Sequence, residues 1–243
     1  MNNNYKKILA ILFIALLSIN LNATSFSQSK KILLNKIYFD NQYTFYCKNP
    51  YKIDEINGKD KALIIKDKRF YSPRNDSFFS FLDNNERAKI VEWEHIMPAE
   101  NFGKHLPCWK EGGRKACAKD ETFKTIESDM HNLVPAIGEV NNDRSNFKFG
   151  AKLPSIGQYG NCEFEVDFQA KRAYPRAEIR GDIARIYFYM SEKYNIKLSK
   201  QERKMMEIWD KEDPISDWEK IKNKSHHNRH ESPPIMRALS SCY

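Results

Sequence analysis

The chain has 243 residues, of which 41% are hydrophobic and 30% are charged. This composition excludes a disordered chain, and the length suits one domain because single hydrophobic cores rarely grow beyond about 250–300 residues. The formal net charge of +8 favours phosphate polyanions, acidic membranes or acidic proteins as partners and does not choose among them.

The N-terminus has the three parts of an export signal. Two lysines precede an apolar run from Ile8 to Leu21, and Ala23 then offers a small residue at a cleavage point. The run is shorter than the ~20 residues that a membrane helix needs. We therefore expect residues 1–23 to be a signal peptide and residues 24–243 to be the mature protein, periplasmic or secreted and without membrane contact. An uncleaved N-terminal anchor is the alternative.

The first half of the mature chain has one clear strand and one predicted helix. Residues 32–47 are rich in large hydrophobic side chains and suit either a helix or a strand. Lys89 to His95 has β-branched and aromatic residues closed by Pro98, which predicts a strand that ends near His95. Leu133 to Asn141 is predicted to be a helix entered through Pro135, whose missing N–H does no harm in a first turn.

The second half is predicted to be helical. Apolar residues recur at the spacing of an amphipathic helix at Ile179, Ile183, Ile186 and Met190. Ser199-x-x-Glu202 and Ser216-x-x-Glu219 are capping boxes that begin two more helices. From about residue 222 the chain is rich in His, Asn, Ser and Pro and is expected to be irregular. Helices outweigh strands without alternating with them, so the predicted fold class is α+β, a single mixed domain.

The cysteines fit an oxidising compartment, where disulfides form. All five are disulfide candidates, namely Cys47, Cys108, Cys117, Cys162 and Cys242. No Cys-x-x-Cys pair occurs, so their spacing does not match a zinc site. Cys108 and Cys117 bracket a glycine-containing loop, and we predict a local bridge between them. Because five is odd, at least one cysteine is free or pairs with another molecule.

Glu94 and His95, at the predicted strand end, supply two groups that a phosphodiesterase needs. Neutral imidazole can accept a proton from water near pH 7, and a carboxylate can hold a divalent cation against a phosphate. Strand alternation sends adjacent side chains to opposite faces, so both reach one site only if the strand twists or ends there. Alone, such a pair is more typical of a structural contact.

Three further clusters strengthen the interpretation. Gly112 to Lys115 is a basic tip on the Cys108–Cys117 loop, suited to a phosphate or to an ordinary turn. Glu127 to Asn132 contains polar groups that also suit helix capping. Asn141 and Arg144 are three residues apart on the predicted helix, so an oxygen ligand and a guanidinium could project together. A polar helix C-terminus is the alternative for this pair.

Together these blocks resemble the bacterial endonuclease I family. The matching residues are Glu94-His95-x-x-Pro98, Cys108-Trp109 with Gly112-Gly113-Arg114-Lys115-x-Cys117, and Asp129-Met130-His131-Asn132 followed by Asn141-x-Asp143-Arg144-Ser145-Asn146. The blocks keep one order, from about Thr44 to Trp218. The resemblance implies a periplasmic or secreted nuclease with a ββα-metal (His-Me finger) motif.

The resemblance also implies a role for each matching residue. Glu94 and Asn141 match metal ligands, His95 matches the general base, and Arg114 matches the arginine that contacts phosphate or product. Glu127 matches a position that can support the His95 ring. The implied cofactor is one Mg²⁺ ion, with Mn²⁺ or Ca²⁺ as substitutes, because a carboxylate and an amide form a sparse oxygen site. The implied reaction hydrolyses double- and single-stranded DNA to 5′-phosphate products, with RNA left open; we expect a monomer.

Nonspecific binding is expected because phosphate contacts carry no base information and no sequence-reading module is visible. Lys115, Arg144, Arg180 and Arg185 are candidates for contacts to the DNA backbone, and each arginine equally suits a structural ion pair.

The chain departs from the family pattern at its cysteines and its C-terminus. The family typically has eight paired cysteines, so at least one of its disulfides is missing here. Ser225 to His230 contains three histidines, which suit a solvated tail or a Zn²⁺ or Cu²⁺ site. The alternative functions are therefore a secreted nucleic-acid-binding protein without catalysis, or an exported metal-binding protein acting through this tail.

Overall fold

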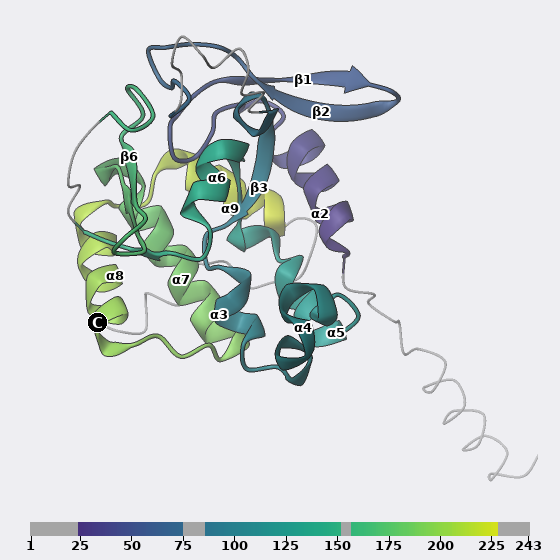
Figure 1. Ribbon diagram of the computed structural model, residues 1–243, viewed down its shortest axis with the longest axis vertical. Helices are drawn as coiled ribbons and strands as arrows, with labels where there is room; N and C mark the ends of the chain where they lie inside the picture. The colour runs from purple at the N-terminus through teal and green to yellow at the C-terminus, as the bar shows by residue number, and fades with distance from the viewer. Residues whose placement is uncertain (1–23, 75–85, 152–156, 228–243) are drawn as a thin grey trace, which may run out of the picture.

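The described part of this protein forms helices and three small sheets (Figure 1), and helix outweighs strand, as the α+β prediction requires. The computed structural model describes residues 24–74, 86–151 and 157–227. The predicted signal peptide, most of the predicted tail and Cys242 lie outside these residues. Within the described ranges, no helix combines the length and apolar character needed to cross a membrane.

The described chain begins with helix α2 (Phe26–Ile32), which a capping box starts: Ser25 Oγ accepts from the Gln28 amide, and the Gln28 side chain accepts from the Ser25 amide. A π-helical turn, η1 (Leu33–Ile37), continues it. This segment packs into a small second core made of Leu33, Ile37, Tyr38, Met130 and Leu133. Helix is thus the correct alternative for the start of residues 32–47.

Strands β1 (Tyr51–Ile56) and β2 (Lys59–Ile64) form an antiparallel hairpin that extends from the body above α2 (Figure 1). A short 3₁₀ helix, η2 (Glu86–Lys89), leads into strand β3 (Val91–His95). The strand predicted to end near His95 is therefore confirmed.

Strand β3 pairs antiparallel with β4 (Leu133–Ile137), with His95 opposite Leu133, and helix α6 (Gly138–Arg144) follows β4 directly. Helix α6 packs against both strands. The chain between β3 and β4 forms α3 (Ala99–Gly103), α4 (Pro107–Cys117), α5 (Glu121–Glu127) and the 3₁₀ turn η3 (Met130–Asn132).

The helix predicted over Leu133 to Asn141 is wrong in its first half. The residues of β4 are all buried, and a short continuous apolar run does not distinguish a buried strand from a buried helix. Pro135 is tolerated because β4 has only β3 as a neighbouring strand, so a ladder donor can be missing. Its carbonyl oxygen accepts from the Phe45 amide at 2.7 Å.

The rest of the chain forms a third sheet and three helices. The sheet has the order β5 (Lys148–Phe149), β7 (Arg172–Pro175), β6 (Phe164–Asp167). A 3₁₀ turn, η4 (Ala177–Ile179), precedes α7 (Arg180–Tyr194), α8 (Lys200–Glu212) and α9 (Asp217–His227). The predicted stripe of α7 is buried and both capping boxes form. The expectation of irregular chain from residue 222 is wrong as far as His227, where α9 ends.

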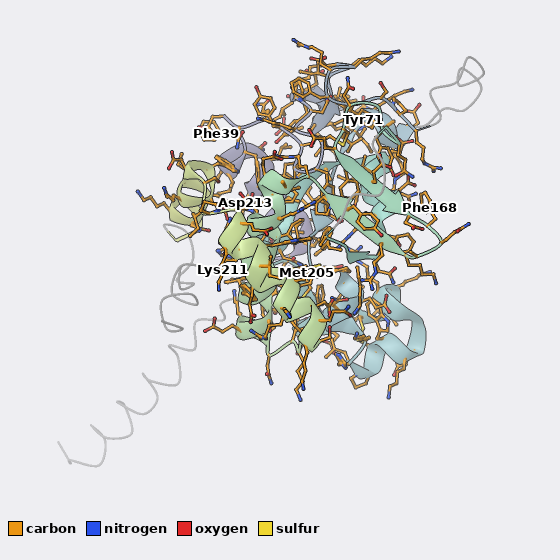
Figure 2. The ribbon with its side chains drawn as sticks, turned by 90° about the vertical axis from the view of Figure 1, so that its left-hand side faces the viewer. Phe39, Tyr71, Phe168, Met205, Lys211 and Asp213 are labelled. Carbon is orange, nitrogen blue, oxygen red and sulfur yellow. A yellow bond between two sulfur atoms is a disulfide. The ribbon has the colours of Figure 1, made fainter. Side chains whose placement is uncertain are left out.

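Helices α7 and α8 pack together through a glycine. The Gly181 amide donates to the Asp213 carboxylate at 2.8 Å, and a Cβ at position 181 would lie 1.9 Å from the Asp213 carbonyl oxygen. No larger residue allows this approach. Figure 2 shows Asp213 beyond the end of α8, with Lys211 and Met205 along that helix.

Two disulfides link distant or local parts of the chain. The predicted Cys108–Cys117 bridge is confirmed, and Cys47 pairs with Cys162. The segment between Cys108 and Cys117 was expected to be a loop, but it is helix α4 with a kink at Gly112 and Gly113. Gly113 has φ +63°, a conformation that glycine adopts without a steric penalty.

Candidate functional site

A cleft of about 370 Å³ lies where β3 ends beside α6 and α4. Its walls include five of the predicted site residues and several polar neighbours, namely Glu94, His95, Arg114, Asn141 and Arg144 with Arg87, Glu100, Asn142 and Asn146. Residues that are almost fifty positions apart in sequence therefore share one site, because β3, β4 and α6 fold as a unit.

His95 is held in one tautomer. Its Nε2 lies 2.8 Å from the carbonyl oxygen of Glu127. A carbonyl oxygen can only accept, so Nε2 carries the proton and Nδ1 keeps its lone pair. Burial, assisted by the positive charges of Arg114 and Arg144, lowers the pKa of His95 to about 3 against the opposing Glu127 carbonyl. The imidazole is therefore neutral throughout the neutral pH range, with Nδ1 unprotonated.

Glu94 is only 4% exposed and is held through one of its two oxygens. Glu94 Oε1 accepts from the Tyr46 hydroxyl and from Arg144 Nη1, both at 2.9 Å. Both of these bonds go to Oε1, which leaves Oε2 unused by Tyr46 and Arg144; the His95 backbone amide also bonds to this carboxylate. Burial raises the pKa of the Glu94 carboxyl, while Arg144 and Tyr46 lower it. A divalent cation would favour the ionised form further.

The end of β3 explains how adjacent residues reach one cleft. The strand stops at His95, and Arg144 donates to the carbonyl oxygens of His95 at 2.8 Å and Ile96 at 2.7 Å. Asn132 also clamps the turn, accepting from the Met97 amide at 2.7 Å. The strand therefore ends at His95, as it must if the adjacent side chains of Glu94 and His95 are to reach one cleft.

Asn141 presents an amide in the second turn of α6. Its Nδ2 donates to Glu92 Oε2 at 2.8 Å, and Arg87 Nη2 bonds to the same oxygen at 2.5 Å. With its nitrogen held in this way, Asn141 has Oδ1 left as an oxygen acceptor. Among the described residues, no group of three or more His, Cys, Asp or Glu side chains is arranged to hold a metal. One carboxylate oxygen and one amide oxygen suit a hard cation that retains most of its water ligands.

Arg114 and Glu127 are linked to each other and to His95. Arg114 Nε lies 2.7 Å from Glu127 Oε1, and half of the Arg114 side chain is exposed. Glu127 was expected to support the His95 ring; it does so through its backbone carbonyl, while its carboxylate holds Arg114. Lys115, the next residue on α4, is exposed.

Two of the arginines proposed as DNA contacts are buried, and that interpretation is wrong for both. Arg144 has no exposed surface; its two terminal nitrogens bond to Glu94 and to the backbone carbonyls at the end of β3, while its Nε has no hydrogen-bond partner among the described residues. Arg185 is 2% exposed on its side chain and pairs with Asp182, Asp210 and Glu219. A buried guanidinium with these partners cannot reach a DNA phosphate in this conformation.

Arg180 is half-buried, and its contacts lie within the protein. Its Nε donates to the carbonyl oxygen of Pro175 at 3.1 Å, and its guanidinium carbon lies 5.6 Å from the centre of the Trp209 ring. Composition does not distinguish a surface arginine from a buried one. The ion-pair alternative therefore holds for Arg144 and Arg185.

The sequence analysis did not identify several residues that contact the side chains of the cleft. Glu92 precedes Glu94 by two positions and so points to the same face of β3, a signal that strand alternation supplied. Tyr46 and Phe26 had no such signal, because they reach the site from segments that precede β3 by more than forty residues.

The chain is similar to known proteins over most of its length. Residues 25–235 match the model of the family described as endonuclease I. The chain is 40% identical over 221 residues to an extracellular deoxyribonuclease of Aeromonas hydrophila, which covers 90% of this chain and 92% of that one. It is 42% identical over 203 residues to a periplasmic deoxyribonuclease of the same organism, covering 83% and 80%. It is 45% identical over 189 residues to Endonuclease-1 of Buchnera aphidicola subsp. Acyrthosiphon pisum (strain APS), covering 78% and 71%.

Proposed function

Because the chain belongs to the endonuclease I family, we propose that it is a metal-dependent, sequence-nonspecific endodeoxyribonuclease that acts at the Glu94–His95 cleft. Its relatives are extracellular or periplasmic deoxyribonucleases, which supports export and action outside the cytoplasm. DNA is the substrate, in double- or single-stranded form, and RNA is a second substrate to be tested.

The unit β3–β4–α6 is proposed to be a ββα-metal motif. An antiparallel strand pair followed by a helix places Glu94 and His95 on the first strand and Asn141 on the helix. In this assignment Glu94 Oε2 and Asn141 Oδ1 are the protein ligands of one divalent cation. Mg²⁺ fits these hard oxygen donors best, and Mn²⁺ or Ca²⁺ would be substitutes.

The proposed reaction assigns one task to each side chain. His95 Nδ1 takes a proton from a water molecule, which attacks the phosphorus in line with the departing O3′. The P–O3′ bond breaks and the leaving 3′ oxygen takes a proton from solvent water, which gives a 5′-phosphate and a 3′-hydroxyl; His95 later returns its proton to solvent. Arg114 holds a fixed positive charge beside the phosphate oxygens. A bound divalent cation would supply charge neutralisation at the phosphate and the leaving oxygen.

The main support for this proposal is the hydrogen bond that fixes the tautomer of His95. The bond from His95 Nε2 to the Glu127 carbonyl leaves the basic nitrogen Nδ1 on a residue that lines the same cleft as Glu94, Asn141 and Arg114. A histidine kept neutral by burial beside two oxygen ligands and a cation is suited to general-base hydrolysis of a phosphodiester.

The test is the His95→Ala variant, with His105→Ala as its matched control because His105 is exposed and lies outside the cleft lining. A positioned general base contributes about 10²–10⁴-fold to a rate, so His95→Ala should lose that much plasmid cleavage and His105→Ala none. DNA affinity, measured at two salt concentrations, should be unchanged because Lys and Arg contacts to phosphate dominate it.

Four further results define the activity and separate the alternatives. EDTA should abolish cleavage by the wild type, and an RNA substrate in the same assay shows whether RNA is also cut. A His95→Ala protein with native circular dichroism and wild-type cleavage would remove His95 from the mechanism. A wild-type protein that binds DNA but never cleaves it would establish the nucleic-acid-binding alternative.

A further inference from the structure

Phe26 contacts two proposed functional side chains that belong to different elements. Its ring centre lies 5.1 Å from that of His95, with the planes tilted by 32°. The Arg114 guanidinium carbon lies 5.5 Å from the centre of the same ring. His95 is the last residue of β3 and Arg114 lies near the end of α4, so Phe26 bridges the strand and the helix.

The Phe26 contact leaves the hydrogen-bonding edge of His95 free. Imidazole nitrogens bond in the plane of the ring, and Nε2 already uses this plane for the Glu127 carbonyl. A tilted aromatic contact restricts rotation of the imidazole without competing for the in-plane bond of Nε2. Phe26 therefore complements Glu127, since both contact His95 and Arg114 at the same time.

Helix α2 holds Phe26 through contacts that do not involve its ring. The Ser25 capping box starts the helix, and Ser29 Oγ, fully buried, donates to the Ser128 carbonyl oxygen at 2.7 Å. The next turn, from Leu33 on, is anchored in the second core. Phe26 therefore projects from a fixed element, which is what the precise placement of a site residue needs.

We propose that Phe26 is a positioning residue of the nuclease site: its ring keeps the His95 imidazole and the Arg114 guanidinium in one relative geometry, so that base and cation act on the same phosphate. This inference rests on the proposed function of the cleft. It assigns the first helix of the mature chain to the site rather than to a linker that follows the export signal.

Three substitutions test the proposal. Phe26→Ala removes the ring, Phe26→Leu keeps apolar bulk without an aromatic face, and Phe26→Tyr keeps the aromatic face. Because small misplacements of reacting groups can reduce a rate by up to about a hundredfold, we expect kcat to fall about tenfold in the Ala and Leu variants. It should stay near wild type for Phe26→Tyr. KM should change less than about twofold in all three, since ground-state DNA binding comes mainly from Lys and Arg side chains elsewhere on the protein.

Ser27→Ala is the matched control, because Ser27 is the exposed neighbour of Phe26 on the same helix. An independent readout is the proton NMR signal of the His95 ring, which the ring current of Phe26 should displace in the wild type and in Phe26→Tyr but not in Phe26→Leu. Circular dichroism and thermal unfolding confirm that each variant is folded. The Leu variant preserves the docking of α2 if the Ala variant loosens it.

The outcomes are distinguishable from a failure of the proposed function. Folded Phe26→Leu and Phe26→Ala proteins with wild-type kcat would overturn the positioning role, as would a change confined to KM. If His95→Ala itself cleaves normally, the proposed function of the cleft fails first. If His95→Ala is inactive and Phe26→Leu is fully active, only the role of Phe26 is lost.

Discussion

Arg144 and Arg185 are both buried and both paired with carboxylates, but they distribute their hydrogen bonds differently. Arg185 makes a two-point contact with Glu219, 2.7 Å at each bond, and further bonds to Asp182 and Asp210 at 3.0 Å. Arg144 instead contacts one oxygen of Glu94 and gives its other bonds to backbone carbonyls.

This difference in hydrogen bonding distinguishes a structural ion cluster, around Arg185, from a candidate functional site, around Arg144. In the Arg185 region, the arginine takes both oxygens of Glu219 and also bonds to Asp182 and Asp210. In the Arg144 region, the second oxygen of Glu94 stays available at a cleft. A buried arginine that leaves one carboxylate oxygen unused therefore indicates a place where another cation can bind. We expect substitutions in the two regions to have different consequences.

The largest expected effect is on stability, in the Arg185 region. Arg185→Met leaves Asp182, Asp210 and Glu219 without their buried partner, and removal of one member of a buried ion pair costs about 3–5 kcal/mol. Urea denaturation should show a loss of that size. The folded fraction should still cleave DNA with wild-type kcat; a specific loss of kcat would mean that this region belongs to the active site after all.

Lys222 offers a second test in the same region, with a defined pH dependence. Burial lowers the pKa of Lys222 to about 8, although Asp182, Glu219 and Asp129 oppose the shift. The unfolded lysine has a pKa near 10.4, so between about pH 8 and 10.4 the unfolded state binds more protons and stability rises with pH. Below this window the full penalty of burying the charge applies.

Lys222→Met should therefore be more stable than the wild type at pH 7, by an amount on the order of 3 kcal/mol. It should also lose the rise in stability that the wild type shows from about pH 8 upward. Urea unfolding at pH 7, 8 and 9.5 measures both. Parallel curves for the two proteins would show that the Lys222 ammonium is adequately compensated in the fold.

Arg144→Lys tests the role of Arg144 at the cleft, the second region of the comparison. Lysine keeps the charge but not the planar fork that serves Glu94 and two carbonyl oxygens together. We expect about a hundredfold loss of kcat, because the end of β3 is no longer held in place. The affinity for Mn²⁺, followed by electron paramagnetic resonance, should fall as well. Arg185→Lys is the control: it should lose stability without losing Mn²⁺ affinity.

Part of this site could be predicted from the sequence, and the limit is physical. Glu94 and His95 lie next to each other and the strand that carries them has a clear β-pattern, so local residues identified them. The family resemblance supplied Asn141 and Arg114, which the fold then brings to the same cleft. These predictions were possible because each residue belongs to a short sequence motif.

The predictions that were wrong depend on burial and on long-range pairing. Arg144 and Arg185 look like surface cations in a basic sequence, and only the packing of α6 and α7 shows that they are enclosed. Leu133 to Ile137 is apolar throughout, so pairing with β3 makes it a strand despite Pro135. Phe26 reaches His95 through the docking of α2, which no periodicity in the sequence encodes.

The smallest expected effect concerns the second proposed ligand of the cation. Asn141→Ala removes the amide oxygen, whereas Asn141→Asp keeps an oxygen and adds a charge. Because one of two protein ligands is lost while the water ligands remain, we expect Asn141→Ala to raise the Mg²⁺ concentration for half-maximal cleavage. Loss of a supporting group at a metal site typically reduces affinity by about 10–100-fold, and we expect the lower end. Asn141→Asp should stay close to the wild type.

Asn35→Ala is the matched control for this experiment, because Asn35 is an exposed helical asparagine whose amide also donates to a carboxylate, that of Asp60 at 3.0 Å, and it lies outside the cleft lining. Its Mg²⁺ titration should coincide with that of the wild type. If Asn141→Ala also coincides, the bond from Asn141 to Glu92 is only a structural contact of α6 with β3. Glu94, held by Arg144 and Tyr46 through a single oxygen, would then be the sole protein ligand at the cleft, and the comparison with the Arg185 cluster would rest on that carboxylate alone.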